Sequence, residues 1–139
     1  MSVEQNKANE RRFIEEVINK GNIEKMPEFI AANYIYHLPG NELKGTEGLK
    51  QILSIYKVAL PDLQYKIENM VGEGDLLAVF CTVSGTLKGA FMGTPPTNKR
   101  MVLPAALLTR WEGGKEVEAW PYSDSLSMYR QLGIPLPKE

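Results

Sequence analysis

The spacing of the hydrophobic residues changes near Leu63, and this change constrains the fold more than any other feature of the sequence. Before that point, apolar side chains recur at helical spacing, as in the segment Glu4–Lys20. After it, Leu63, Tyr65 and Ile67 alternate with polar residues, which is the period of a half-buried strand. Helices followed by antiparallel strands predict an α+β fold in which the helices cover one face of a curved sheet.

The first half of the chain predicts three helices and one short extended segment. The helices cover Glu4–Lys20, which ends at Gly21, then Asn22–Ile30, which Pro27 breaks into two short turns, and a third stretch that Thr46 caps and Pro61 stops. Tyr34–His37 is predicted to be extended.

The second half predicts antiparallel strands and a closing helix. The strands are a run that begins at Leu63, Leu76–Thr86, Met101–Trp111 and Lys115–Tyr122, and the helix is Asp124–Gln131. Turn residues at 72–75 make the first two strands a hairpin, and Gly113-Gly114 joins the last two. Pro104 cannot donate a backbone hydrogen bond, so we expect it at a sheet edge or a bulge.

Length and charge exclude several classes of protein. A chain of 139 residues, 43% of them hydrophobic, predicts a single domain over residues 1–139 with a core large enough to need no cofactor for stability. The 16 Lys and Arg against 17 Asp and Glu leave no basic excess for nucleic acid. No apolar run approaches the roughly 20 residues of a membrane span, so we expect a cytoplasmic protein that binds neither nucleic acid nor membrane.

Metal ligands are scarce in this sequence. His37 is the only histidine and Cys81 the only cysteine, so zinc, blue-copper and two-histidine iron sites lack their ligands. Cys81 lies in an apolar run without basic neighbours, which predicts a buried thiol in a reducing compartment. We therefore expect no metal.

Asp124 is the first candidate for chemistry. The period of a strand places Trp120, Tyr122 and Asp124 on one side, so the carboxylate would follow two aromatic rings into an apolar space. Burial there would raise its pKa toward the range useful for proton transfer. The alternative is a solvated cap on the closing helix.

His37 is the second candidate. Its imidazole could exchange a proton or donate to a carbonyl oxygen. The alternative is a structural or exposed histidine, because no acidic residue lies at local spacing to orient it.

Several short motifs, taken together, resemble the SnoaL-like polyketide cyclases of the nuclear-transport-factor-2-like superfamily over nearly the whole chain. They are Gly45-Thr46-Glu47-Gly48, Pro61-Asp62-Leu63, Gly74-Asp75, Gly85-Thr86, Phe91-Met92-Gly93-Thr94-Pro95-Pro96-Thr97, Gly114-Lys115, Glu118, Trp120, Asp124 and Gln131-Leu132-Gly133. Each is weak alone, and their order and spacing make the signature.

The resemblance implies a cone-shaped fold: a curved antiparallel sheet packed against N-terminal helices, with an apolar pocket inside and a second copy paired outside. Family cyclases close a ring by intramolecular aldol condensation without a cofactor, and use an aspartate as acid/base that matches Asp124. Two positions where many relatives have histidine hold Leu87 and Ala119. A third, near the aspartate, holds Arg110, which could pair with a carboxylate and lower its pKa.

These observations predict an enzyme that acts on a small apolar, carbonyl-bearing ligand, with Asp124 and His37 as catalytic residues. The expected substrate-binding residues are Trp120, Tyr122, Tyr34, Phe91, Met92, Leu107 and Arg110. A binding module without chemistry, or an isomerase or hydratase on the same scaffold, is the alternative. We also expect a homodimer, because the segment 102–108 is apolar on both strand faces.

Overall fold

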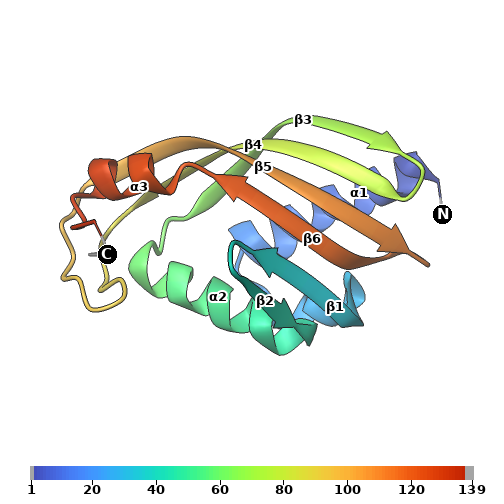
Figure 1. Cartoon of the computed structure of the whole chain (residues 1–139), viewed down its shortest axis with the longest axis horizontal. Helices are drawn as coiled ribbons and strands as arrows, with labels where there is room; N and C mark the ends of the chain where they lie inside the picture. Colours follow the sequence, from blue (N-terminus) through green and yellow to red (C-terminus); the bar gives the residue numbers. More distant parts are fainter. Residues whose placement is uncertain (1, 137–139) are drawn as a thin grey trace.

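A six-stranded, curved and unclosed sheet forms the body of the protein, and helices lie against its concave side (Figure 1). The computed structural model describes residues 2–136. The α+β fold expected from the change of hydrophobic period is therefore confirmed. No helix within the described residues is long and apolar enough to cross a membrane.

The helical elements are α1 (Val3–Phe13), a π-helical turn (Ile14–Asn19), a 3₁₀ helix (Ile23–Glu28), α2 (Gly45–Ala59) and α3 (Ser125–Leu132). A capping box between Ser2 and Gln5 starts α1, because each side chain accepts from the other's backbone N–H. The single helix predicted over Glu4–Lys20 instead changes to π geometry after Phe13. It ends, as predicted, at Gly21, which has a φ of 76°.

The strands are β1 (Ile30–Leu38), β2 (Asn41–Lys44), β3 (Gln64–Glu73), β4 (Leu76–Thr86), β5 (Arg100–Glu112) and β6 (Lys115–Ser123). Their order across the sheet is β2-β1-β6-β5-β4-β3. All neighbours are antiparallel except β1 and β6, which run parallel. The antiparallel sheet that the resemblance implies is confirmed at the four other pairs. The parallel direction of β1 and β6 could not be predicted, because hydrophobic period carries no information about strand direction.

The region between Glu28 and Thr46 differs most from its prediction. The second helical stretch ends at Glu28, and β1 is longer than the extended segment Tyr34–His37. Strand β2 was not predicted, because its four residues carry too little apolar alternation. Helix α2 begins after Lys44 without a side-chain cap, so the predicted capping by Thr46 was wrong.

Pro104 lies in β5, opposite Thr82 of β4, with no register shift. On the other side, pairing of β5 with β6 begins only at Ala105. Pro104 therefore occupies a local edge of a central strand, where its missing donor costs no ladder hydrogen bond, as expected.

A bulge in β6 decides which side chains face inward. Trp111 pairs with Glu116 and Arg110 pairs with Glu118, so Val117 is an extra residue in β6. Trp111 and Glu116 are both buried on the concave side of the sheet. Beyond the bulge, Glu118 and the alternate residues after it face the convex side.

Candidate active site

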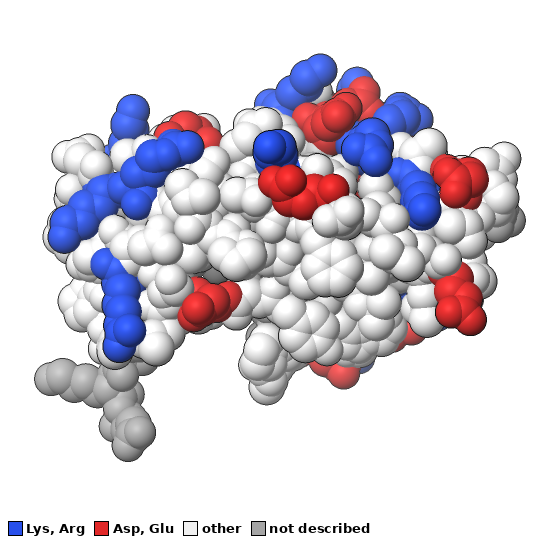
Figure 2. Space-filling view, turned by 90° about the horizontal axis from the view of Figure 1, so that it is seen from above, with Lys and Arg blue, Asp and Glu red and all other residues white. Residues whose placement is uncertain are grey.

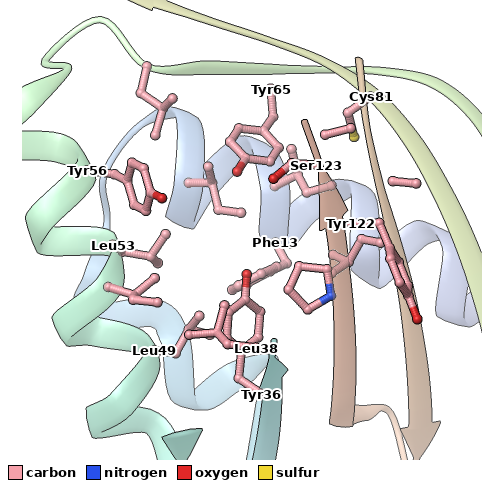
Figure 3. Close-up of a pocket in the computed structure, with 18 of the residues that line it drawn as sticks. Phe13, Tyr36, Leu38, Leu49, Leu53, Tyr56, Tyr65, Cys81, Tyr122 and Ser123 are labelled. Carbon is pink, nitrogen blue, oxygen red and sulfur yellow. The ribbon is translucent and has the colours of Figure 1, made fainter. Parts of the chain in front are cut away.

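A cavity of about 330 Å³ lies between the concave face of the sheet and the helices α1 and α2 (Figure 3). Its walls are mostly apolar. The helices and the π-helical turn contribute Phe13, Ile14, Ile18, Leu49, Ile52, Leu53 and Tyr56, and the rest comes from Tyr34, Tyr36, Leu38, Pro39, Leu63, Tyr65, Cys81, Ala105, Ala106, Leu107, Glu116, Pro121, Tyr122, Ser123 and Ser125. The size and the apolar walls suit a small organic molecule.

Three tyrosine hydroxyls point into this cavity from three different elements. Tyr36 comes from β1, Tyr56 from α2 and Tyr65 from β3, and Figure 3 shows their hydroxyls converging on the same space. Burial raises the pKa of Tyr65 to about 12 and raises the pKa values of Tyr36 and Tyr56 above their ordinary value. All three therefore stay protonated at neutral pH and remain hydrogen-bond donors.

A buried acidic cluster forms the floor of the cavity. Glu116 of β6 and Tyr34 of β1 line the cavity, and Glu10 of α1 lies behind Glu116. Glu116 is 1% exposed and Glu10 is 0% exposed. Burial raises the pKa of Glu10 to about 7 and raises that of Glu116 well above its ordinary value.

Sequence reasoning missed these two carboxyls. A signal was present for Glu10, since Asn6, Glu10 and Phe13 follow one another at the spacing of the buried face of α1. Glu116 carried no such signal, because the bulge at Val117 shifts the alternation of β6.

Asp124 does not lie in the cavity. Its exposed carboxylate accepts the backbone N–H of Ser127 at 2.9 Å and caps α3. It belongs to a shallow groove on the convex face that Tyr122 and Phe80 also line. The prediction that Tyr122 and Asp124 lie on the same side of the sheet was correct. The predicted placement of the Asp124 carboxylate inside the main cavity was wrong, because that side is the convex one.

His37 also lies on the convex face, in an ion-pair network. Its ring stacks on Trp120 with centroids 4.9 Å apart, and its Nε2 lies 2.8 Å from Glu118. Arg110 donates to the same Glu118 through Nε at 2.8 Å and pairs with Glu112. Arg110 therefore pairs with Glu118 and not with Asp124. His37 Nδ1 also lies 3.4 Å from Glu42 of β2, so the expectation that no acidic residue lies at local spacing was wrong. The second partner, Glu118, is brought there by β6.

Only some of the other predicted substrate-binding residues line the cavity. Tyr34 and Leu107 line the cavity, as expected. Tyr122 contributes to the wall, but its side chain is 64% exposed and its hydroxyl points away from the cavity centre (Figure 3). Phe91 packs in the core against Tyr56 with ring centroids 5.6 Å apart, and Met92 is 80% exposed in a turn, so neither lines the cavity.

The thiol in the cavity wall is not an activated nucleophile. Cys81 of β4 is buried, as predicted, and burial raises its pKa to about 11. The thiol therefore stays neutral at neutral pH. Leu87 and Ala119, at the two positions where the resemblance implies histidine in many relatives, are fully buried apolar residues.

Comparisons with known proteins agree with this architecture. The family model for SnoaL-like polyketide cyclases matches residues 8–132. A search among curated proteins found no match.

Several solved structures share the fold. IdmH from Streptomyces antibioticus, described as a proposed polyketide cyclase, is 29% identical, with a TM-score of 0.82 over 93% of this chain and 99% of that one. AclR from Streptomyces galilaeus, described as a proposed hydroxylase, is 25% identical, with a TM-score of 0.85 over 98% of this chain and 100% of that one. A proposed SnoaL-like cyclase from Jannaschia sp. is 22% identical, with a TM-score of 0.87 over 98% of each chain, and shows the fold alone.

The family match covers most of the chain, and the solved structures share its fold. The chain belongs to the SnoaL-like polyketide cyclase family.

Proposed function

We propose that this protein is an acid/base enzyme, working without a cofactor, that closes a ring by intramolecular aldol condensation of a small, apolar, carbonyl-bearing molecule. The observation that carries this proposal is the enclosed apolar cavity into which three tyrosine hydroxyls converge. Family membership supports the reaction class.

The cavity supplies the two conditions that ring closure needs. Its apolar walls exclude water and hold a flexible chain folded, so that the two reacting carbons lie close together. The hydroxyls of Tyr36, Tyr56 and Tyr65 then donate to the carbonyl oxygen on which negative charge develops as the enolate forms. Because burial keeps these phenols protonated, they are donors at the pH where the enzyme would work.

A ligand-binding protein without chemistry is the second candidate. The position of Asp124 favours it, since the aspartate that resembles the family's acid/base caps α3 on the convex face. Catalysis by Asp124 and His37 stays a prediction, and it requires a substrate that reaches the convex face.

Two reactions in deuterated buffer separate these candidates. The enzyme proposal expects exchange of the α-proton of ethyl acetoacetate, and ring closure of a linear diketone whose carbonyls are spaced for a six-membered ring. Tyr36→Phe and Tyr65→Phe should each lower the exchange rate about 10- to 100-fold, the size expected for losing one donor to a developing oxyanion.

Tyr129→Phe is the matched control, because Tyr129 lies in α3 and does not line the cavity. It should leave the exchange rate within about twofold. Ester binding by a wild-type protein that exchanges no proton would support the binding module and reject the enzyme.

A further inference from the structure

Glu10, Glu116 and Tyr34 form a closed polar group under an otherwise apolar cavity. Tyr34 and Glu116 line the cavity, and all three side chains are buried to within 1% exposure. They come from α1, β1 and β6, and the backbone N–H of Glu116 is fixed by the carbonyl of Phe29 at 2.8 Å. The position of the group is therefore set by three separate elements.

The carboxyl oxygens of Glu10 and Glu116 have no hydrogen-bond donor unless one of the two carboxyls is itself protonated. Within residues 2–136, neither oxygen of Glu10 nor Oε2 of Glu116 has a hydrogen-bond partner. Glu10 and Glu116 lie close enough for each to influence the pKa of the other, and Tyr34 lies beside Glu116. Two carboxyls can share a hydrogen bond only when one of them is protonated.

The surroundings prevent both carboxyls from ionising together. Removal from water disfavours each negative charge, and the second charge would face the first at close range. Among the residues that the structure describes, the other titratable groups that face the pair are Tyr34 and Tyr36 of β1 and Cys81 of β4, and none of these three is cationic. At neutral pH the pair therefore keeps at least one proton, as other paired carboxyls do.

We propose that Glu10 and Glu116 share one proton at the cavity floor and that Glu116 exchanges protons with the bound substrate. Glu116 is then the catalytic acid/base, and Glu10 is a positioning residue that holds the shared proton. This role rests on the proposed function, and it gives the cavity the base that its tyrosine hydroxyls cannot supply.

The proton balance of the aldol step closes within the pair. The singly protonated pair, with one negative charge, removes the α-proton, and the electrons of the C–H bond pass to the enolate oxygen. The enolate carbon attacks the second carbonyl, a C–C bond forms, and that carbonyl oxygen becomes an alkoxide. The pair, now doubly protonated, returns one proton to the alkoxide, so no other reactant is consumed.

The shared proton is tested by carboxyl NMR on protein labelled with ¹³C at the glutamate side chains. We expect wild type to show at least one glutamate that titrates near pH 7, and Glu10→Gln to remove that signal or move the Glu116 titration to lower pH. Titration of every glutamate near the ordinary value of 4.5 would overturn the shared proton. This measurement needs no substrate and uses the wild-type fold.

The catalytic role is tested by α-proton exchange of ethyl acetoacetate. Glu116→Gln should lower the rate at least about 100-fold, and Glu10→Gln should shift the midpoint of the pH–rate profile to lower pH. Glu73→Gln changes an exposed carboxyl at the end of β3 and should leave the rate unchanged. Asp124→Asn tests the alternative base, because loss of exchange in this variant would assign the base to Asp124.

The outcomes separate this role from the proposed function. Exchange that survives in a folded Glu116→Gln protein, or is lost in Asp124→Asn, overturns the role of Glu116 and leaves the enzyme proposal standing. Ester binding without exchange by wild type overturns the enzyme proposal, and the role of Glu116 with it.

Discussion

Burial sets the protonation of individual residues in this protein. The same loss of solvent keeps Tyr65 protonated as a donor and keeps a proton on the Glu10–Glu116 pair. In the ion-pair network on the convex face, the pKa shift has the opposite direction, because hydrogen bonds from His37 and Arg110 lower the pKa of Glu118. Two carboxyls of one strand, Glu116 and Glu118, thus differ in protonation because they face opposite sides of the sheet.

The raised pKa of Glu10 predicts how stability depends on pH. Between its unfolded value of 4.5 and its folded value of about 7, the native state keeps a proton that the unfolded chain loses. The free energy of unfolding should therefore fall as pH rises through this window, by at most about 1.4 kcal/mol per pH unit for one proton. Urea unfolding at several pH values measures the slope.

The double variant Glu10→Gln/Glu116→Gln isolates this effect. In this variant the free energy of unfolding should no longer fall between pH 4.5 and about 7, whereas in Glu73→Gln it should fall as in wild type. The same slope in wild type and in the double variant would show that the buried pair does not control it.

Among the elements, α3 depends on a side-chain cap, Asp124, which the sequence predicted to be a catalytic residue. The helix has eight residues, Asp124 accepts the N–H of Ser127 at its start, and Gly133 ends it with a φ of 71°. Such a short helix depends on its ends, because few of its backbone groups are bonded within it.

Asp124→Ala should lower the free energy of unfolding by about 1 kcal/mol, the usual cost of losing a side-chain cap. Asp124→Asn is the matched control, since the amide oxygen can still accept from Ser127. Urea unfolding of the two variants compares them. Equal stability of wild type and Asp124→Ala would show that the cap does not stabilise α3.

For the whole molecule, the convex face of the sheet is the main apolar surface left uncovered by the helices. Figure 2 shows a broad uncharged area on the face seen from above, with charged side chains gathered mainly at its margins. The exposed apolar side chains of the convex face include Val71, Leu76, Phe80, Val102 and Tyr122. A sheet face of this kind is usually covered by a partner.

We therefore expect a homodimer that pairs through this convex face. Light scattering at micromolar concentration should give twice the 15.6 kDa of the chain, and Phe80→Lys should shift the protein toward monomer. Val58→Lys places the same charge at an exposed apolar position of α2 and should leave the dimer intact. A monomeric wild type would contradict the expectation.

The sequence by itself determined the α+β class, the β3–β4 hairpin, the strand nature of β5 and β6 and the family, because each depends on local periodicity, turn residues or motif order. Tertiary structure alone decided which face of β6 lines the cavity. Strand alternation correctly predicted that Tyr122 and Asp124 lie on the same side of β6. The bulge at Val117 and the curvature of the sheet make that side convex and direct Glu116 toward the cavity. The pairing of Glu10 with Glu116, more than 100 residues apart, exists only once α1 packs against the sheet, because a hydrophobic pattern indicates which residues are buried and not which residues meet there.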